Sequence, residues 1–136
     1  MTVSLGPDES IHHWRITLAG PPSTPYDQGT FGLTLDLPTD YPFKAPLVKF
    51  ATRIYHPNVT NDASGNICLG MLKPDAWKPS SQITAVLEAV RNLLVEPLPE
   101  DPLETRIAEE YRSDRAEFEK NARAYVERYA KGEPSF

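Results

Sequence analysis

The stretch FGLTLDL, residues 31–37, decides the fold class of this chain. Its apolar residues fall on every second position with Gly, Thr and Asp between them, which is the pattern of a strand with one buried face. A weaker alternation of the same kind occupies residues 11–18, and Val48 and Phe50 suggest a short third strand. No helical stretch separates these segments, so we expect an antiparallel meander rather than a parallel sheet.

The second half of the chain changes to the period of a helix. Apolar residues recur there at three- and four-residue intervals: Ile83, Val86, Leu87, Val90, Leu93 and Leu94. This spacing predicts a helix with one buried face. Ser80 or Ser81 is the candidate N-cap, and Pro97 is expected to end the helix after Val95.

A second helical region is expected over residues 105–130, with a break near Ser113. Asp114 could cap the helix that follows the break, with Glu117 three residues on. Strands first and helices last define an α+β protein. We expect one domain, residues 1–136, in which residues 131–136 form a flexible tail.

Composition excludes several kinds of function. The chain has 136 residues, 40% hydrophobic and 24% charged, which is ordinary for a globular domain. A net charge of -5 argues against a nucleic-acid partner, and no apolar run approaches the roughly 18 residues of a membrane span. A single Cys cannot form an internal disulfide, which fits a reducing compartment, so we expect a cytoplasmic or nuclear protein.

Residues 52–79 have no sustained period and are rich in Pro, Asn, Gly and Ser. An irregular stretch of this length in a compact domain is either a wrong assignment or a functional site. It contains the single Cys, Cys68, and one of three His residues, His56. We therefore place the site in this stretch.

Cys68 could be a buried small hydrophobic residue, but Gly65 and Gly70 flank it outside any core pattern, which favours an accessible thiol. His56 could deprotonate this thiol, or it could brace the loop by hydrogen bonding. The His residues and Cys68 have no zinc-ligand spacing, and no Gly-rich phosphate loop is present, so neither a metal nor another cofactor is expected.

The motif His56-Pro57-Asn58, followed by Cys68 and Trp77, resembles the ubiquitin-conjugating enzymes over nearly the whole chain. Further marks of that family appear in register: Gly20-Pro21, Pro25-Tyr26, Gly29-Thr30-Phe31, Tyr41-Pro42-Phe43-Lys44-Ala45-Pro46 and Asp101-Pro102-Leu103. One short match would be weak, whereas this many in order are highly specific.

The resemblance implies ATP-dependent acyl transfer, in which an activating enzyme passes ubiquitin to Cys68 as a thioester. A substrate lysine or a ligase cysteine then attacks that thioester. The family has no strong base beside its cysteine, so His56 is expected to brace the loop that presents Asn58. The Asn58 amide would either donate to the tetrahedral oxyanion or make the site rigid. Asp101 matches the acid that faces the incoming lysine; the alternative is an N-cap for a helix beginning near Leu103.

The resemblance also implies partner surfaces. Phe43 and Pro79 match the two-loop apolar patch at which the family binds RING- and HECT-type ligases, although a buried aromatic is the alternative for Phe43. Trp77 is expected to be core. The implied partners are ubiquitin or a ubiquitin-like protein, the activating enzyme, a ligase and protein substrates.

Some positions depart from the family pattern. The spacing from Asn58 to Cys68 is longer than in many relatives, so residues 61–64 should bulge outward, and Gly70 stands where many members have Asp. Trp77 and its neighbours resemble the branch that transfers to ligase cysteines, whereas Asp101 favours lysine. We therefore expect competence with both acceptors.

The start of the chain departs most. About ten residues, including Gly6-Pro7, precede the first expected strand in place of the family's N-terminal helix, and the chain could be a fragment, a wrongly defined gene or a natural short form. Apolar surface should then be exposed near Trp14 and Phe31 or at the end of helix 83–95.

Three alternatives to a ubiquitin carrier stay open. The first is a conjugating enzyme for another modifier such as SUMO or NEDD8. The second is a weakly active or non-catalytic scaffold. The third is a cysteine hydrolase outside the family, which would need neither ATP nor an activating enzyme.

Overall fold

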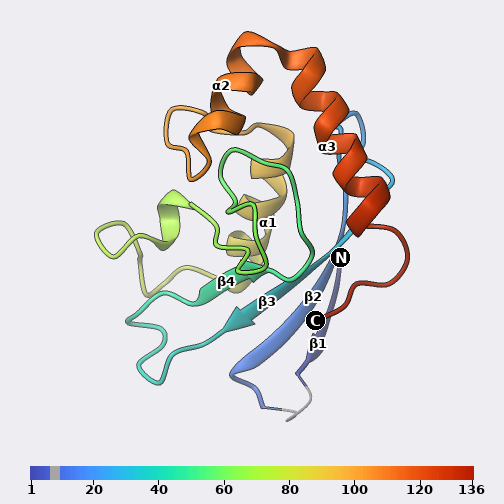
Figure 1. Cartoon of the computed structure of the whole chain (residues 1–136). Coiled ribbons are helices and arrows are strands. Elements are labelled where there is room, and N and C mark those ends of the chain that lie inside the picture. Colours follow the sequence, from blue (N-terminus) through green and yellow to red (C-terminus); the bar gives the residue numbers. More distant parts are fainter. Residues whose placement is uncertain (7–9) are drawn as a thin grey trace.

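The structure is a computed structural model that describes residues 1–6 and 10–136 (Figure 1). The elements in chain order are β1 (Thr2–Leu5), β2 (His13–Ala19), β3 (Thr30–Asp36), β4 (Leu47–Phe50), the 3-10 turn η1 (Gly70–Leu72), α1 (Ile83–Val95), α2 (Thr105–Ser113) and α3 (Arg115–Tyr129). Strands precede helices, so the predicted α+β class is confirmed.

The sheet is an antiparallel meander in the order β1-β2-β3-β4, as expected. Its register places Ile16 opposite Leu33 and Leu35 opposite Val48. These four side chains are buried, whereas their neighbours along each strand, apart from Gly32, are more exposed. The period-2 pattern of the sequence is thus one apolar face of the sheet.

The first strand, β1, was missed by the sequence prediction, which began the sheet at residue 11. Ile11 and His12 lie in a turn before β2, and Gly6 N–H donates to the carbonyl of His13 at 2.8 Å. All four residues of β1 are exposed, so no burial pattern could identify the strand. Pro7, named with Gly6 in the segment that stands in place of the family's N-terminal helix, lies outside the described residues.

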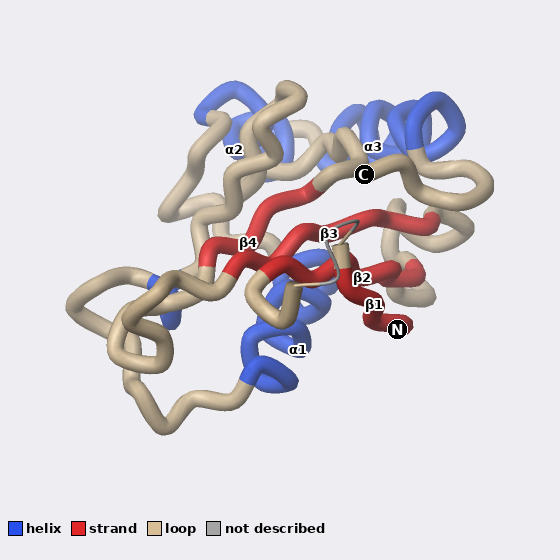
Figure 2. The backbone as a smooth tube through the Cα atoms, turned by 90° about the horizontal axis from the view of Figure 1, so that it is seen from below, coloured by secondary structure: helices blue, strands red, loops and turns tan. Residues whose placement is uncertain are grey.

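Helix α1 covers the apolar face of the sheet and completes the core (Figure 2). Its buried residues are Val86, Leu87, Val90, Leu93 and Leu94. The helix ends at Val95 as predicted, but the N-cap is Gln82 rather than Ser80 or Ser81. Ser81 N–H is engaged in a turn with the carbonyl of Lys78 (2.9 Å), which places the helix start one residue later.

Helices α2 and α3 lie together at the top of the molecule in Figure 1. The chain breaks between them at Asp114, whose Oδ1 accepts a hydrogen bond from Glu117 N–H at 3.2 Å, as predicted. The ring of Phe118 packs edge-on against Tyr111 with centroids 5.0 Å apart. Both helices contact the irregular segment that follows β4, where the Tyr55 hydroxyl donates to Glu110 at 2.8 Å and the Tyr55 ring lies 5.9 Å from that of Phe118.

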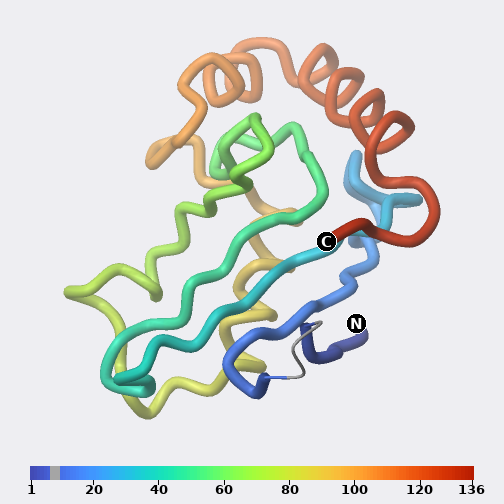
Figure 3. The backbone as a smooth tube through the Cα atoms, turned by 60° about the horizontal axis from the view of Figure 1, so that its bottom comes forward, coloured from blue at the N-terminus to red at the C-terminus, as the bar shows by residue number. Residues whose placement is uncertain are grey.

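The C-terminal segment returns to the sheet over β2 and β3 (Figure 3). A Cβ at Gly32 would lie 2.9 Å from atoms of both Pro134 and Phe136, so the glycine permits this close approach. The guanidinium of Arg15 lies 5.2 Å from the centroid of the Phe136 ring. That the tail is flexible stays a prediction.

The expected exposed apolar surface is found at only some of the predicted positions. Phe31 is fully buried and Trp14 half-buried, but Leu5, which pairs with Trp14, is 42% exposed, and Val95 at the end of α1 is 46% exposed. Val3 of β1 is also exposed. In the part of the chain that the structure describes, no helix has the length and apolar character to cross a membrane.

Candidate active site

The irregular segment between β4 and α1 is held in place by sparse but specific backbone pairing. Isolated antiparallel bridges join Val59 to Ile67 and Lys49 to Asn66. The amide of Cys68 donates to the carbonyl of Asn58 at 2.9 Å. These bonds place the thiol-bearing residue beside the His56-Pro57-Asn58 motif, as a site in this segment requires.

His56 is fully buried and both of its ring nitrogens are occupied. Nδ1 accepts the amide N–H of Asn58 at 2.9 Å, so the ring proton is on Nε2, which donates to the carbonyl of Leu93 at 2.8 Å. Burial lowers the pKa of His56 to about 4, so the ring is neutral near physiological pH. This is the geometry that a brace between the loop and α1 requires, and it leaves no nitrogen to deprotonate Cys68.

Asn58 is buried, and its side-chain amide is saturated with hydrogen bonds. Nδ2 donates to the carbonyls of Leu98 (2.8 Å) and Asp101 (2.9 Å), and Oδ1 accepts from Leu98 N–H at 2.9 Å. An amide nitrogen has two protons, so neither is free for an oxyanion in this arrangement. The side chain instead fastens the loop of residues 98–101 against the segment that carries Cys68.

Asp101 lies beside the thiol. Sγ of the half-buried Cys68 donates to Asp101 Oδ2 at 3.3 Å, and Lys73 Nζ lies 2.9 Å from the same oxygen. The bond from Lys73 holds the pKa of Asp101 below its usual range, so the carboxylate is ionised at neutral pH. Burial, followed by the hydrogen bond and charge of Asp101, raises the pKa of Cys68, while the charge of Lys73 opposes the rise.

The alternative role of Asp101 as a helix cap is wrong. Helix α2 begins at Thr105 with Glu104 as its N-cap residue, later than the predicted start near Leu103. The amides of Leu103 and Glu104 both donate to the carbonyl of Pro57, at 2.9 and 3.1 Å. The Asp101 carboxylate is therefore free of capping and available to the site.

Sequence reasoning missed Lys73. No period or motif marks it, because it follows η1 in a turn and reaches Asp101 only through folding. It also missed the contact that anchors the start of the predicted bulge: Asn61 N–H donates to Glu104 Oε2 at 2.8 Å.

Beyond that anchor, residues 62–64 are exposed, so the predicted outward bulge is confirmed. Gly65 closes the bulge with φ 59°, and a Cβ there would lie 1.9 Å from the Phe50 carbonyl oxygen. At Gly70, by contrast, a Cβ would meet nothing within 4 Å, so the space would admit the Asp found in many family members.

A shallow apolar groove of ≈ 390 Å³ lies over the first of the two predicted partner loops. It is lined by Phe43, Lys44, Ala45, Pro46, Leu47, Leu72, Pro74 and Trp77. Phe43 is 77% exposed, which excludes the buried alternative. Trp77, expected to be core, is half-buried. It lines the groove, and its Nε1 donates to the carbonyl of Pro42 at 2.7 Å. Pro79 is exposed but is not part of the groove wall.

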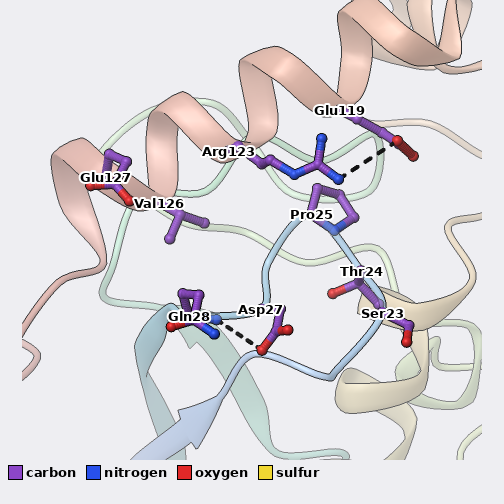
Figure 4. Close-up of a pocket in the computed structure, with 9 residues that line it drawn as sticks. All are labelled: Ser23, Thr24, Pro25, Asp27, Gln28, Glu119, Arg123, Val126 and Glu127. Atoms are coloured by element: carbon purple, nitrogen blue, oxygen red, sulfur yellow. Dashed lines mark hydrogen bonds and ion pairs between the residues drawn. The ribbon is translucent and has the colours of Figure 1, made fainter.

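A separate polar depression of ≈ 480 Å³ lies between the loop before β3 and helix α3 (Figure 4). Its one cation, Arg123, is paired with Glu119 at 3.8 Å, and Asp27 and Glu127 add further carboxylates. No thiol or imidazole lines it. Among residues 1–6 and 10–136, no three His, Cys, Asp or Glu side chains gather closely enough to hold a metal ion.

Comparison with known proteins agrees with this geometry. The family model described as ubiquitin-conjugating enzyme matches residues 1–126. Ubiquitin-conjugating enzyme E2 14 of Schizosaccharomyces pombe is 49% identical over 124 residues, which are 91% of this chain and 79% of the relative.

Two further relatives extend the comparison. Ubiquitin conjugating enzyme E2 B of Dictyostelium discoideum is 40% identical over 91% of this chain and 82% of its own length. The solved E2 domain of a Toxoplasma gondii ubiquitin conjugating enzyme superposes with a TM-score of 0.87 at 35% identity, covering 96% of this chain and 88% of that one.

Proposed function

Since this chain belongs to the ubiquitin-conjugating enzymes, transferases that work with ubiquitin, an activating enzyme and ligases, we propose that it carries ubiquitin as a thioester on Cys68. The observation that carries the proposal is the placement of the single thiol. Cys68 Sγ is half-buried, lies 3.3 Å from an ionised carboxylate, and stands on a segment whose backbone is pinned to Asn58.

Loading exchanges one thioester for another. The Cys68 thiolate attacks the carbonyl carbon of the ubiquitin C-terminal glycine, and the bond from that carbon to the activating enzyme's sulfur breaks. The departing thiolate takes up the proton that Cys68 gave up. The thiolate is the nucleophile, so the raised pKa of Cys68 makes loading faster as pH rises.

Discharge to lysine forms an isopeptide bond. A neutral acceptor amine attacks the thioester carbonyl, the carbon–sulfur bond breaks, and Cys68 leaves as a thiolate that is then protonated. The acceptor arrives as an ammonium ion and must lose a proton before it attacks. Asp101 is ionised and adjacent to the reacting sulfur, so it suits the role of orienting this ammonium beside the thioester.

Asn58 and His56 act in this proposal as positioning residues. Asn58 fixes the 98–101 loop and hence Asp101, and His56 fixes Asn58 to the end of α1. The saturated Asn58 amide favours this role over donation to an oxyanion. The same contacts give the cysteine-hydrolase alternative no support, because neither ring nitrogen of His56 is free to pair with Cys68.

The exposed Phe43, the adjoining groove and exposed Pro79 form the proposed surface for RING- or HECT-type ligases. Phe43→Ala should load normally but lose the acceleration of discharge by a ligase. The acceptors proposed are both substrate lysines and ligase cysteines, in the cytoplasm or nucleus.

A loading assay tests the proposed function and the identity of the modifier. The chain is incubated with ATP and with each activating enzyme and its own modifier, either ubiquitin, SUMO or NEDD8. A product one ubiquitin heavier that collapses under reductant is expected in the ubiquitin reaction alone. Preferential loading with SUMO or NEDD8 would assign a different modifier, and no reducible product with any of them would refute a carrier function.

A further inference from the structure

We propose, on the basis of the proposed function, that Lys73 is a positioning residue that pairs with the Asp101 carboxylate. This pairing favours loading of Cys68 and restrains attack by an acceptor lysine. Both the Cys68 thiol and the Lys73 ammonium contact one oxygen, Asp101 Oδ2, at 3.3 and 2.9 Å. The carboxylate on which the acceptor depends thus already has a resident lysine partner.

The backbones at both ends of the ion pair are fixed, although its side chains are about half exposed. The Lys73 carbonyl accepts the amides of Ala76 and Trp77, both at 2.9 Å, and its own amide donates to Gly70 at 3.2 Å. The Asp101 carbonyl is held by Asn58 Nδ2 at 2.9 Å. Two fixed anchors give this contact a defined geometry that a pair of unrestrained surface side chains lacks.

An acceptor lysine brings the same chemical group that Lys73 already places on Asp101. Once Cys68 forms a thioester, its thiol proton is gone and its hydrogen bond to Oδ2 cannot form. Among the residues that the structure describes, Lys73 is then the partner that this oxygen keeps. The incoming ammonium must displace Lys73 or share the carboxylate with it, which weakens acceptor binding.

The effect on loading has the opposite sign. The negative charge of Asp101 disfavours the Cys68 thiolate and so raises the thiol pKa. The positive charge of Lys73 acts in the opposite direction and lowers that pKa. Asp101, then Cys68 and more weakly Asp75, raise the pKa of Lys73, so it stays charged. His56 does not contribute, because its nitrogens face Asn58 and Leu93. Loss of Lys73 should therefore slow loading and speed discharge to lysine.

The test compares Lys73→Gln with Lys73→Arg and with Lys120→Gln, which removes the same charge from an exposed position on α3. Single-turnover loading is measured between about pH 6 and pH 9. Discharge is measured over a range of free lysine concentrations and, in parallel, to a small thiol. Cys68 is the leaving group in both reactions, so the ratio of the lysine rate to the thiol rate cancels any change in its leaving-group ability.

For an exposed ion pair we expect changes of about two- to fivefold. In Lys73→Gln the loading profile should shift to higher pH, and the ratio of lysine to thiol discharge should rise through a lower KM for lysine. Lys73→Arg should restore both values and Lys120→Gln should change neither. In the Asp101→Asn background, Lys73→Gln should no longer change the ratio of lysine to thiol discharge. A purely structural role of Lys73 would predict that the change persists in that background.

An unshifted loading profile, or a discharge ratio that is unchanged or lower in Lys73→Gln, would overturn the inference. Such results in a protein that still forms the reducible thioester would leave the proposed function intact. If the unaltered chain forms no thioester at all, the proposed function itself fails, so the two failures are distinguishable.

Discussion

The buried His56 predicts a specific dependence of stability on pH. Its pKa in the folded chain is about 4, against an ordinary value of 6.5, because burial disfavours the charged ring. The unfolded chain therefore binds a proton as pH falls through about 6.5, while the folded chain stays neutral at this position until about pH 4. The stability that His56 contributes is thus present above pH 6.5 and is lost between pH 6.5 and pH 4.

The magnitude follows from the size of the shift. A gap of about 2.5 units corresponds to about 3 kcal/mol in full, and between about pH 7.5 and pH 5 to about 2 kcal/mol. The assay is urea unfolding of the unaltered chain and of His56→Gln at both pH values. Gln cannot titrate, so the unaltered chain should lose its advantage over the variant by about 2 kcal/mol at the lower pH.

Comparison of the two chains cancels the titration of carboxylates and of the other His residues, which both chains share. A difference in the free energy of unfolding that stays constant between the two pH values would refute the reasoning. It would mean that His56 is not held neutral in the folded chain, and the brace between Asn58 and α1 would have to be reconsidered.

Other predictions concern the loop and its carboxylate. Asn58→Ala leaves polar groups of the 98–101 loop unpaired, so it should lower the free energy of unfolding by about 1–3 kcal/mol. It should also slow discharge to lysine more than discharge to a small thiol. Equal slowing of the two reactions would indicate collapse of the loop. Asp101→Asn should still load but should slow attack by lysine. It should also shift the pH profile of Cys68 alkylation to lower pH, because the carboxylate raises the thiol pKa. An unshifted alkylation profile would contradict the contact between Cys68 and Asp101. Gly65→Ala should lower the thermal midpoint, because the added Cβ clashes with the Phe50 carbonyl in a left-handed backbone, and an unchanged midpoint would show that the bulge can rearrange.

The parts of the fold that the sequence predicted are those with a clear local signal. Alternation over residues 31–37 predicts β3 because a strand repeats every two residues, and the apolar stripe of α1 follows the helical period. Asp114 was identified as a cap because a capping carboxylate accepts a hydrogen bond from an amide only three residues along the chain. Strand β1 gave no such signal, since its exposed residues are recognisable only by their pairing with β2.

The residues of the candidate site could be named from the sequence, but their contacts could not. His56, Asn58 and Cys68 could be named from the motif, yet the occupied amide of Asn58 depends on carbonyls 40 and 43 residues away. Lys73 and Asp101 are 28 residues apart and meet only when the loops fold together. Sequence spacing cannot show these long-range contacts, which is why the role of Asn58 stayed open and that of Lys73 was missed.

The most direct measurement of the central claim is the mass and position of the ubiquitin bond after loading with ATP and activating enzyme. The unaltered chain should form an adduct that reductant removes, Cys68→Ala should form none, and Cys68→Ser should form a reductant-resistant ester that maps to position 68. An adduct on Cys68→Ala that still requires ATP and the activating enzyme, or an unaltered adduct that survives reductant, would contradict the account.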